Sequence, residues 1–233
     1  MSDLFEDVIL WKPLKVVSIM IFLLVIVLLP FSQFWSVIVL FGLICLWSRV
    51  PSLASMFTKD FDVVDFFVVM LAIHVGGFFG GVFGFIVMMF SRLFGPNEYF
   101  LYTLKDSLGI MIAGFLTPLF YSVTGSALVS LYAFTVVRWV IYLGLTTVLD
   151  PEYMALELGL CSLGTLTSYL YNTFVMKTFE GALLGVFAGG VHFSLGLFIV
   201  ATGVIGGFYL VGKGAKFLEK IFPKKEEKLF VNN

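Results

Sequence analysis

Long apolar runs, separated by short polar stretches, dominate the chain. The runs lie at 16–30, 34–48, 62–91, 107–122, 126–149, 156–176 and 181–212, and each is bounded by charged residues, proline or glycine. A helix needs about 20 apolar residues to cross a hydrocarbon layer of roughly 30 Å. The pattern therefore predicts an all-α protein, a polytopic transmembrane helical bundle with six to eight membrane segments.

Two of these runs, 62–91 and 181–212, are longer than a membrane is thick. Each would extend about 45 Å or more as one helix, so each is either a strongly tilted helix or a hairpin. Five glycines in the first run favour a continuous helix, because small residues spaced by four let helices approach closely. This glycine stripe consists of Gly76, Gly80 and Gly84, with Gly77 and Gly81 beside them, and we expect it to form a helix–helix contact.

The placement of positive charge favours a hairpin instead, because Lys and Arg collect in cytoplasmic loops. With seven single spans and a cytoplasmic N-terminus, 5 positive residues face the cytoplasm and 8 face outward. Dividing 62–91 changes these counts to 12 against 1, and dividing 181–212 instead gives 11 against 2. We therefore predict an even number of crossings in the cell membrane, with both termini cytoplasmic.

The two ends of the chain differ from its middle. An N-terminal interfacial segment covers 1–15, the transmembrane helical domain covers 16–212, and a basic tail covers 213–233. The N-terminus is not a signal peptide, because acids precede its first lysine and no small-residue cleavage site follows. The lysines of Lys213–Lys228 alternate with apolar residues, which predicts an amphipathic helix on anionic lipid headgroups. A plain stop-transfer cluster of lysines is the alternative.

Composition narrows the classes of protein that remain. Hydrophobic residues make up 60% of the chain and charged residues 12%, against about a quarter charged in soluble proteins. A net charge of −1 provides no basic field for nucleic acid. Cys45 and Cys161 lie in apolar runs and are interpreted as small hydrophobic residues. A single glutamine, four asparagines and a Lys/Glu-rich tail hint at a heat-adapted source.

Arg138 is the residue that most needs an explanation, because it lies at the midpoint of the run 126–149. A cation at that depth costs at least about 2.5–3.5 kcal/mol on insertion scales, so something must compensate it. One interpretation is an anion site or an ion path. The other is a salt bridge or carbonyl contact that fixes helix packing. The acids considered as ion-pair partners are Asp65, Glu157 and Glu180.

Other polar residues carry less specific signals. His74 and His192 are candidate ligand-binding residues together with Arg138, but neither has a companion at metal-ligand spacing, so packing is the simpler role. The run Asp60, Asp62 and Asp65 can hold Mg²⁺ with a phosphate, or can simply form a solvated helix start. The stretch 92–106, which ends in Lys105 and Asp106, is interpreted as an interfacial segment. No motif for catalysis, a cofactor or a metal is present, and we expect a protein that is not an enzyme.

From Arg92 onward the chain resembles the Yip family of membrane proteins. The matching elements are Leu93 to Gly95, Pro118, Thr124-Gly125, Gly144-Leu145 and Asp150 to Ala155. The resemblance implies an interaction or membrane-organising protein, since eukaryotic members are linked to vesicle traffic and Rab-type GTPases. A second likeness, carried by DFFVVMLAIHVGGFFGGVFGF and the compact helical size, is to substrate-binding components of energy-coupling-factor vitamin transporters.

Two functional hypotheses follow from these observations. The first is a non-catalytic membrane-organising or partner-binding module that associates with a membrane protein or with a second copy of itself. The second is a small-molecule transporter, or a substrate-binding subunit of one, with Arg138 in a mid-membrane polar site. A transporter needs a polar cavity at mid-depth, whereas a module needs only packed faces.

Overall fold

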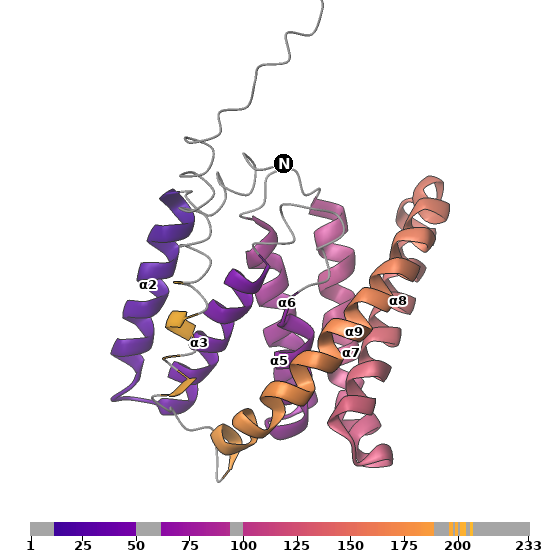
Figure 1. Ribbon diagram of the computed structural model, residues 1–233. Helices are drawn as coiled ribbons and strands as arrows, with labels where there is room; N and C mark the ends of the chain where they lie inside the picture. Colours follow the sequence, from indigo (N-terminus) through magenta and orange to yellow (C-terminus); the bar gives the residue numbers. More distant parts are fainter. Residues whose placement is uncertain are drawn as a thin grey trace, which may run out of the picture.

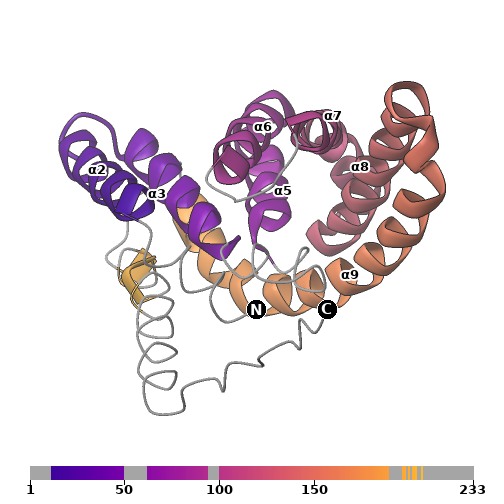
Figure 2. The same cartoon turned by 90° about the horizontal axis from the view of Figure 1, so that it is seen from above.

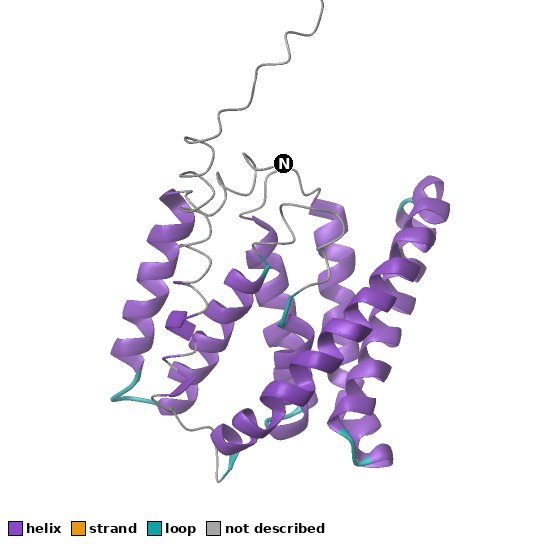
Figure 3. Ribbon diagram, in the orientation of Figure 1, coloured by secondary structure: helices purple, strands orange, loops and turns teal. Residues whose placement is uncertain are grey.

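The computed structural model of this chain describes residues 12–49, 62–93 and 100–188, together with seven positions between 196 and 206. Throughout these ranges every regular element is a helix, and they contain no strand (Figure 3). The prediction of an all-α fold is therefore confirmed for this part of the chain. His192, Asp60 and the basic tail 213–233 lie outside the described residues.

Seven α-helices and one short 3-10 turn lie within residues 12–49, 62–93 and 100–188, and successive helices alternate in direction (Figure 1). Their bounds are Lys12–Leu28 for α2, Gln33–Ser48 for α3, Val64–His74 for α5, Gly77–Leu93 for α6, Phe100–Thr124 for α7, Ala127–Leu149 for α8, Pro151–Tyr153 for η2 and Met154–Phe187 for α9. Seen from above, the pair α2 and α3 lies at one side, α5, α6 and α7 lie in the middle, and α9 runs along one face (Figure 2). Each helix packs mainly on its neighbours in sequence, while α5 also contacts α7, α8 and α9.

Helices α2 and α3 form the first hairpin, closed by side-chain hydrogen bonds. Ser32 caps α3, because its hydroxyl accepts a hydrogen bond from the backbone N–H of Trp35. The indole N–H of Trp47 donates to Ser18 Oγ at 2.8 Å, and Ser36 Oγ donates to the carbonyl of Val25 at 2.8 Å. The apolar runs 16–30 and 34–48 are thus two separate helices, as the sequence predicts, and a tight turn joins them.

The run 62–91 is divided into two helices, α5 and α6. The chain turns at Gly76, whose φ of 137° lies in a region that side chains other than glycine rarely adopt. After this turn α6 runs back along α5, with Gly80 beside Ala72 and Gly84 beside Val68. The run therefore forms the hairpin that the charge distribution favours. It does not form the continuous helix that the glycine repeat favours.

Helix α9 is longer than the sequence indicated. It continues for 34 residues, from Met154 to Phe187. The runs 156–176 and 181–212 were expected as separate segments, since Lys177, Glu180 and Gly181 interrupt the apolar pattern. These residues lie within α9 instead, because a helix interior accepts Lys and Glu readily and tolerates a single glycine.

Two helices, α7 with 25 residues and α8 with 23, are long and apolar enough to cross a membrane. The other apolar stretches within helices are shorter and cover 14–28, 33–48, 64–74 and 77–91. The structure therefore establishes an all-helical chain with two helices of spanning length. The expected count of six to eight spans stays a prediction.

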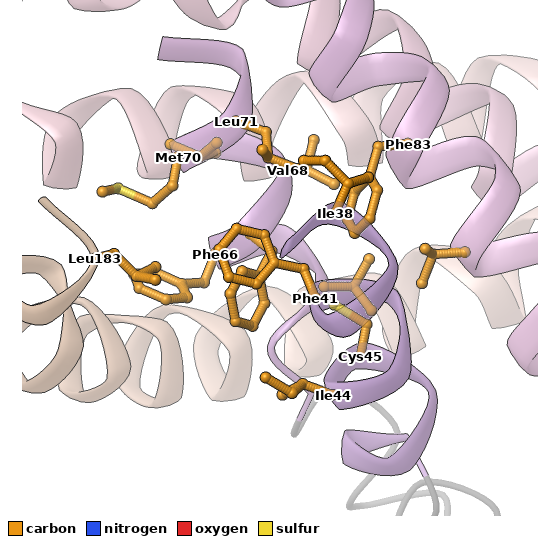
Figure 4. Packing of buried hydrophobic residues seen from close by; sticks show 14 of the residues in the cluster. Ile38, Phe41, Ile44, Cys45, Phe66, Val68, Met70, Leu71, Phe83 and Leu183 are labelled. Atoms are coloured by element: carbon orange, nitrogen blue, oxygen red, sulfur yellow. The ribbon is translucent and has the colours of Figure 1, made fainter. Parts of the chain in front are cut away.

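Aromatic and aliphatic side chains fill the space between α3, α5, α6 and α9. Phe41 of α3 lies at the centre of this cluster, with its ring centroid 4.5 Å from that of Phe67 and 6.2 Å from that of Phe187 (Figure 4). Phe41 is fully buried and Phe66 nearly so. This apolar cluster holds α3 against α5, and α5 carries Asp65, one of the charged residues described next.

Candidate functional site

Arg138 is buried in the interior, where two carboxylates bind its guanidinium. Its Nε donates to Asp106 Oδ1 at 2.8 Å and its Nη2 donates to Asp106 Oδ2 at 3.0 Å. Its Nη1 donates to both carboxylate oxygens of Asp65 at 2.7 Å. All three side chains are at most 5% exposed. We call these three residues, Asp65, Asp106 and Arg138, the Arg138 cluster.

Three helices bring the Arg138 cluster together. Arg138 is the twelfth of the 23 residues of α8, and Asp106 lies on α7 one turn before Gly109. A side chain at Gly109 would meet the backbone carbonyl of Arg138 at 2.9 Å, so glycine is required for α7 and α8 to approach this closely. Asp65 lies in the first turn of α5, where the helix dipole favours a carboxylate.

A second buried ion pair ties the start of α5 to the end of α3. Arg49 Nη1 lies 2.6 Å from Asp62 Oδ2, and both side chains are at most 5% exposed. The other oxygen of Asp62 accepts a hydrogen bond from the backbone N–H of Val64 at 2.9 Å. Ser48 Oγ accepts a further one from Val63 at 3.2 Å. These contacts satisfy backbone donors at the start of α5 that the helix itself leaves without partners.

A third ion pair links α7 to the end of α8. Lys105 is fully buried, and its Nζ lies 3.0 Å from Asp150 Oδ2. The ammonium also lies over the rings of Tyr102 and Tyr142, 4.6 and 5.3 Å from their centroids. The stretch 92–106, which was interpreted as an interfacial segment, is helical from Phe100 onward, because α7 begins there, and its Asp106 is buried.

The sequence-suggested partners of Arg138 lie in different places. Asp65 is bonded to it, as described. Glu157 is buried in the first turn of α9, and Glu180 is on the distal part of the same helix, and neither is paired with Arg138. Asp106 was not named as a partner from sequence, although it makes the two-pronged contact with the guanidinium.

His74 does not share the surroundings of Arg138. It is the last residue of α5, nine positions after Asp65, or about 14 Å along the helix axis. Its ring stacks on that of Phe187 with centroids 4.7 Å apart. The described residues therefore do not bring His74 and Arg138 into one site.

The five glycines lie at the contacts of α6 with α5 and α7 and in the turn before α6. A Cβ at Gly80 would meet backbone and Cβ atoms of α5 at 2.7 Å. A Cβ at Gly84 would meet Val68 of α5 at 2.6 Å and Ile110 of α7 closer still. Gly77 and Gly81 face α7 instead, where a Cβ would meet the carbonyl oxygens of Phe115 and Met111 at 2.6 and 2.5 Å. Gly76 lies in the turn, where a Cβ would meet no atom within 4 Å.

The aspartate run does not form a metal centre in the part of the chain that the structure describes. Asp62 and Asp65 bind different arginines, as described above. Among the described residues no group of three or more His, Cys, Asp or Glu side chains is arranged to hold a metal ion.

Comparison of the chain with known proteins provides no relative to which it can be assigned. No protein-family model, no curated protein and no solved structure matches it.

Proposed function

We propose that this chain is a multi-pass helical protein of the cell membrane. The observation that carries this proposal is an inverted distribution of polarity. Seven charged residues are at most 6% exposed, namely Arg49, Asp62, Asp65, Lys105, Asp106, Arg138 and Glu157. Large apolar side chains cover the outside, and α2 alone exposes seven of them. Water as the surrounding solvent would favour the opposite arrangement, whereas lipid favours this one.

Extraction of membranes tests this location. The protein should stay in the membrane fraction after a wash at alkaline pH with carbonate, and should leave it only with detergent. A peripheral protein of the same host, followed in the same samples, is the control. Release of the chain by carbonate would contradict the proposal.

Within the membrane, the function supported best is that of a non-catalytic organising or partner-binding module. All three guanidinium nitrogens of Arg138 are hydrogen-bonded to Asp65 or Asp106. The residue that most resembled an anion site thus holds α5, α7 and α8 together. The resemblance to the Yip family supports the same role.

Site-specific photo-crosslinking in the native membrane tests this role. A photoreactive residue at Val140, which is 64% exposed on α8, should give a discrete protein adduct. The matched control is Leu131 on the same helix, which is fully buried and should give none. Val136 repeats the test one turn earlier on the same face of α8, and Leu170 on α9 extends the scan to a second helix; both are exposed. Adducts with lipid alone from all exposed positions would overturn the module proposal.

A transporter, or a substrate-binding subunit of one, is the second candidate. The feature in its favour is the short helix α5, which has 11 residues and begins beside Arg138 at the midpoint of α8. Helices that start at mid-depth line the substrate sites of many transporters. A panel of small anions should then raise the melting temperature of the wild type and not that of Arg138→Leu. Equal stabilisation of both proteins would remove Arg138 from any anion site.

The proposed topology places both termini in the cytoplasm and the lysine tail on anionic lipid. Because Cys45 and Cys161 are buried, a cysteine added within 229–233 gives the main labelling signal in intact cells. We expect no reaction with a membrane-impermeant reagent until the cells are opened. Reaction in intact cells would exclude the even number of crossings.

A further inference from the structure

The two carboxylates of the Arg138 cluster differ in how strongly hydrogen bonds from Arg138 stabilise their negative charge. Asp106 receives Nε and Nη2 of Arg138 in a two-pronged arrangement. Asp65 receives only Nη1, which is shared between its two oxygens. Two-pronged contacts of this kind are the stronger ones for a carboxylate and a guanidinium.

We propose that Asp65 is a proton-binding site, which is protonated when α5 is packed against α8 and which loosens this packing when it ionises. The ligand is a proton, and the site is the side chain of Asp65 at the buried start of α5. Two carboxylates that share one buried cation do not both ionise readily, because the second negative charge has no cation of its own in a medium of low dielectric constant. This inference holds for either of the two proposed functions.

Groups on every helix around Asp65 bear on its ionisation. From α3 come Arg49, which is paired with Asp62 at 2.6 Å, and the thiol of Cys45. From α7 come Asp106 and Lys105, and Lys105 is paired with Asp150 at 3.0 Å. On α8 the titratable groups near the cluster are Arg138 and Tyr142. On α9 they are Glu157, Cys161 and Tyr171. The described side chains of α6, over 77–91, include no titratable group.

Arg138 favours a negative charge on Asp65, whereas the two nearest carboxylates oppose it. Asp62 is three residues earlier in the same chain segment, and Asp106 lies on the other side of the same guanidinium. The cations Arg49 and Lys105 each have a carboxylate of their own at hydrogen-bonding distance. Arg138 is thus the cation bonded to Asp65, and Asp106 competes for it.

Infrared difference spectroscopy of the purified protein in lipid nanodiscs detects the proton directly. On raising the pH from about 6 to about 9, the wild type should lose one band of the protonated carboxyl C=O stretch. Asp65→Asn should lack this change, because its amide cannot ionise. Glu157→Gln is the matched control, since it removes another buried acid, and it should keep the band.

Thermal unfolding over the same pH range gives a second readout. An exposed aspartate ionises near pH 4, about 3.9 in model peptides. A native state that holds Asp65 protonated is therefore favoured at low pH and loses this advantage as the pH rises through the ionisation of the buried group. The melting temperature of the wild type should fall by about 5 °C, and that of Asp65→Asn should stay level.

Three results would overturn the inference. The first is a wild type without a pH-dependent carboxyl band. The second is the same band in Asp65→Asn, because the proton would then belong to another group, and loss of the band in Glu157→Gln would identify that group. The third is an Asp65→Asn protein that does not fold, since a neutral side chain of nearly the same shape is the proposed native state.

Discussion

Helix α5 is held on two sides by opposite kinds of contact. Towards α6 the contact is made by glycines, and a Cβ at Gly80 would lie only 2.7 Å from atoms of Ala72 and Val68. Towards α7 and α8 the contact is ionic, through Asp65, Asp106 and Arg138. The glycine side depends on shape and leaves no room for added volume. The ionic side depends on charge balance, and it is disturbed when one charge is removed from the group.

Replacing Arg138 should lower the stability of the protein more than any other substitution considered below. We expect Arg138→Leu to lower the free energy of unfolding by about 3–5 kcal/mol, because Asp106 is left buried without its cation and Asp65 without its hydrogen-bond donor. Thermal unfolding in detergent measures the change. The triple variant Arg138→Leu, Asp65→Asn, Asp106→Leu should recover most of the loss. A single variant as stable as the wild type would show that the ionic side contributes little.

Adding one methyl group to the glycine side should have the next largest effect. Gly80→Ala forces a Cβ against the backbone of α5, and overpacking of this kind costs about 1–3 kcal/mol. The same thermal measurement applies. Because Gly80 faces α5 of its own chain, the variant should keep the oligomeric state of the wild type in detergent, measured by light scattering. A change of oligomeric state without a loss of stability would place this glycine at an interface between copies.

The two members of the Lys105–Asp150 ion pair differ in burial, so replacing one or the other should lower the free energy of unfolding by different amounts. Lys105 is fully buried, while the Asp150 side chain is 20% exposed. Asp150→Asn leaves the ammonium in the interior with a weaker partner and should cost about 2–3 kcal/mol. Lys105→Met leaves a carboxylate that reaches the surface and should cost about 1 kcal/mol. Equal losses, measured by thermal unfolding at one pH, would contradict the assigned burial of Lys105.

The smallest expected effect comes from a glycine without neighbours. Gly144 on α8 is exposed, and a Cβ built there has no atom within 4 Å. Gly144→Ala should therefore be neutral or stabilise the protein by about 0.5–1 kcal/mol through helix propensity. It is the matched control for Gly80→Ala. Comparable losses in both variants would mean that close packing is not what distinguishes Gly80.

Helix positions followed from the sequence more readily than helix ends. The run 126–149 became α8 at 127–149, because a proline-free apolar stretch between Gly125 and Asp150 leaves few alternatives. The break at Gly76 was not visible in the glycine spacing, since the same residues can serve one long helix or the two faces of a hairpin. The charge counts, which respond to the direction of each helix, favoured the hairpin.

The site was predictable only in part. The position of Arg138 within an apolar run indicated that it needs a partner, and Asp65 was among those considered. Asp106 was overlooked because it follows Lys105 in a stretch with aromatic residues. A usable signal was present in the spacing of Asp106, Ile110, Ala113 and Thr117, which places them on one helix face, and all four are buried.

The distances along the chain between the members of the Arg138 cluster bear on the order in which the protein is made. Asp65 precedes Arg138 by 73 residues and Asp106 precedes it by 32. At synthesis rates of about 5–20 residues per second, Arg138 is made roughly 4–15 s after Asp65. If α5 is inserted in a membrane, as we propose, it must spend that time either neutral or near the bilayer surface. Final docking of α5 therefore follows the emergence of α8, so this bundle is completed in an order different from that of its sequence.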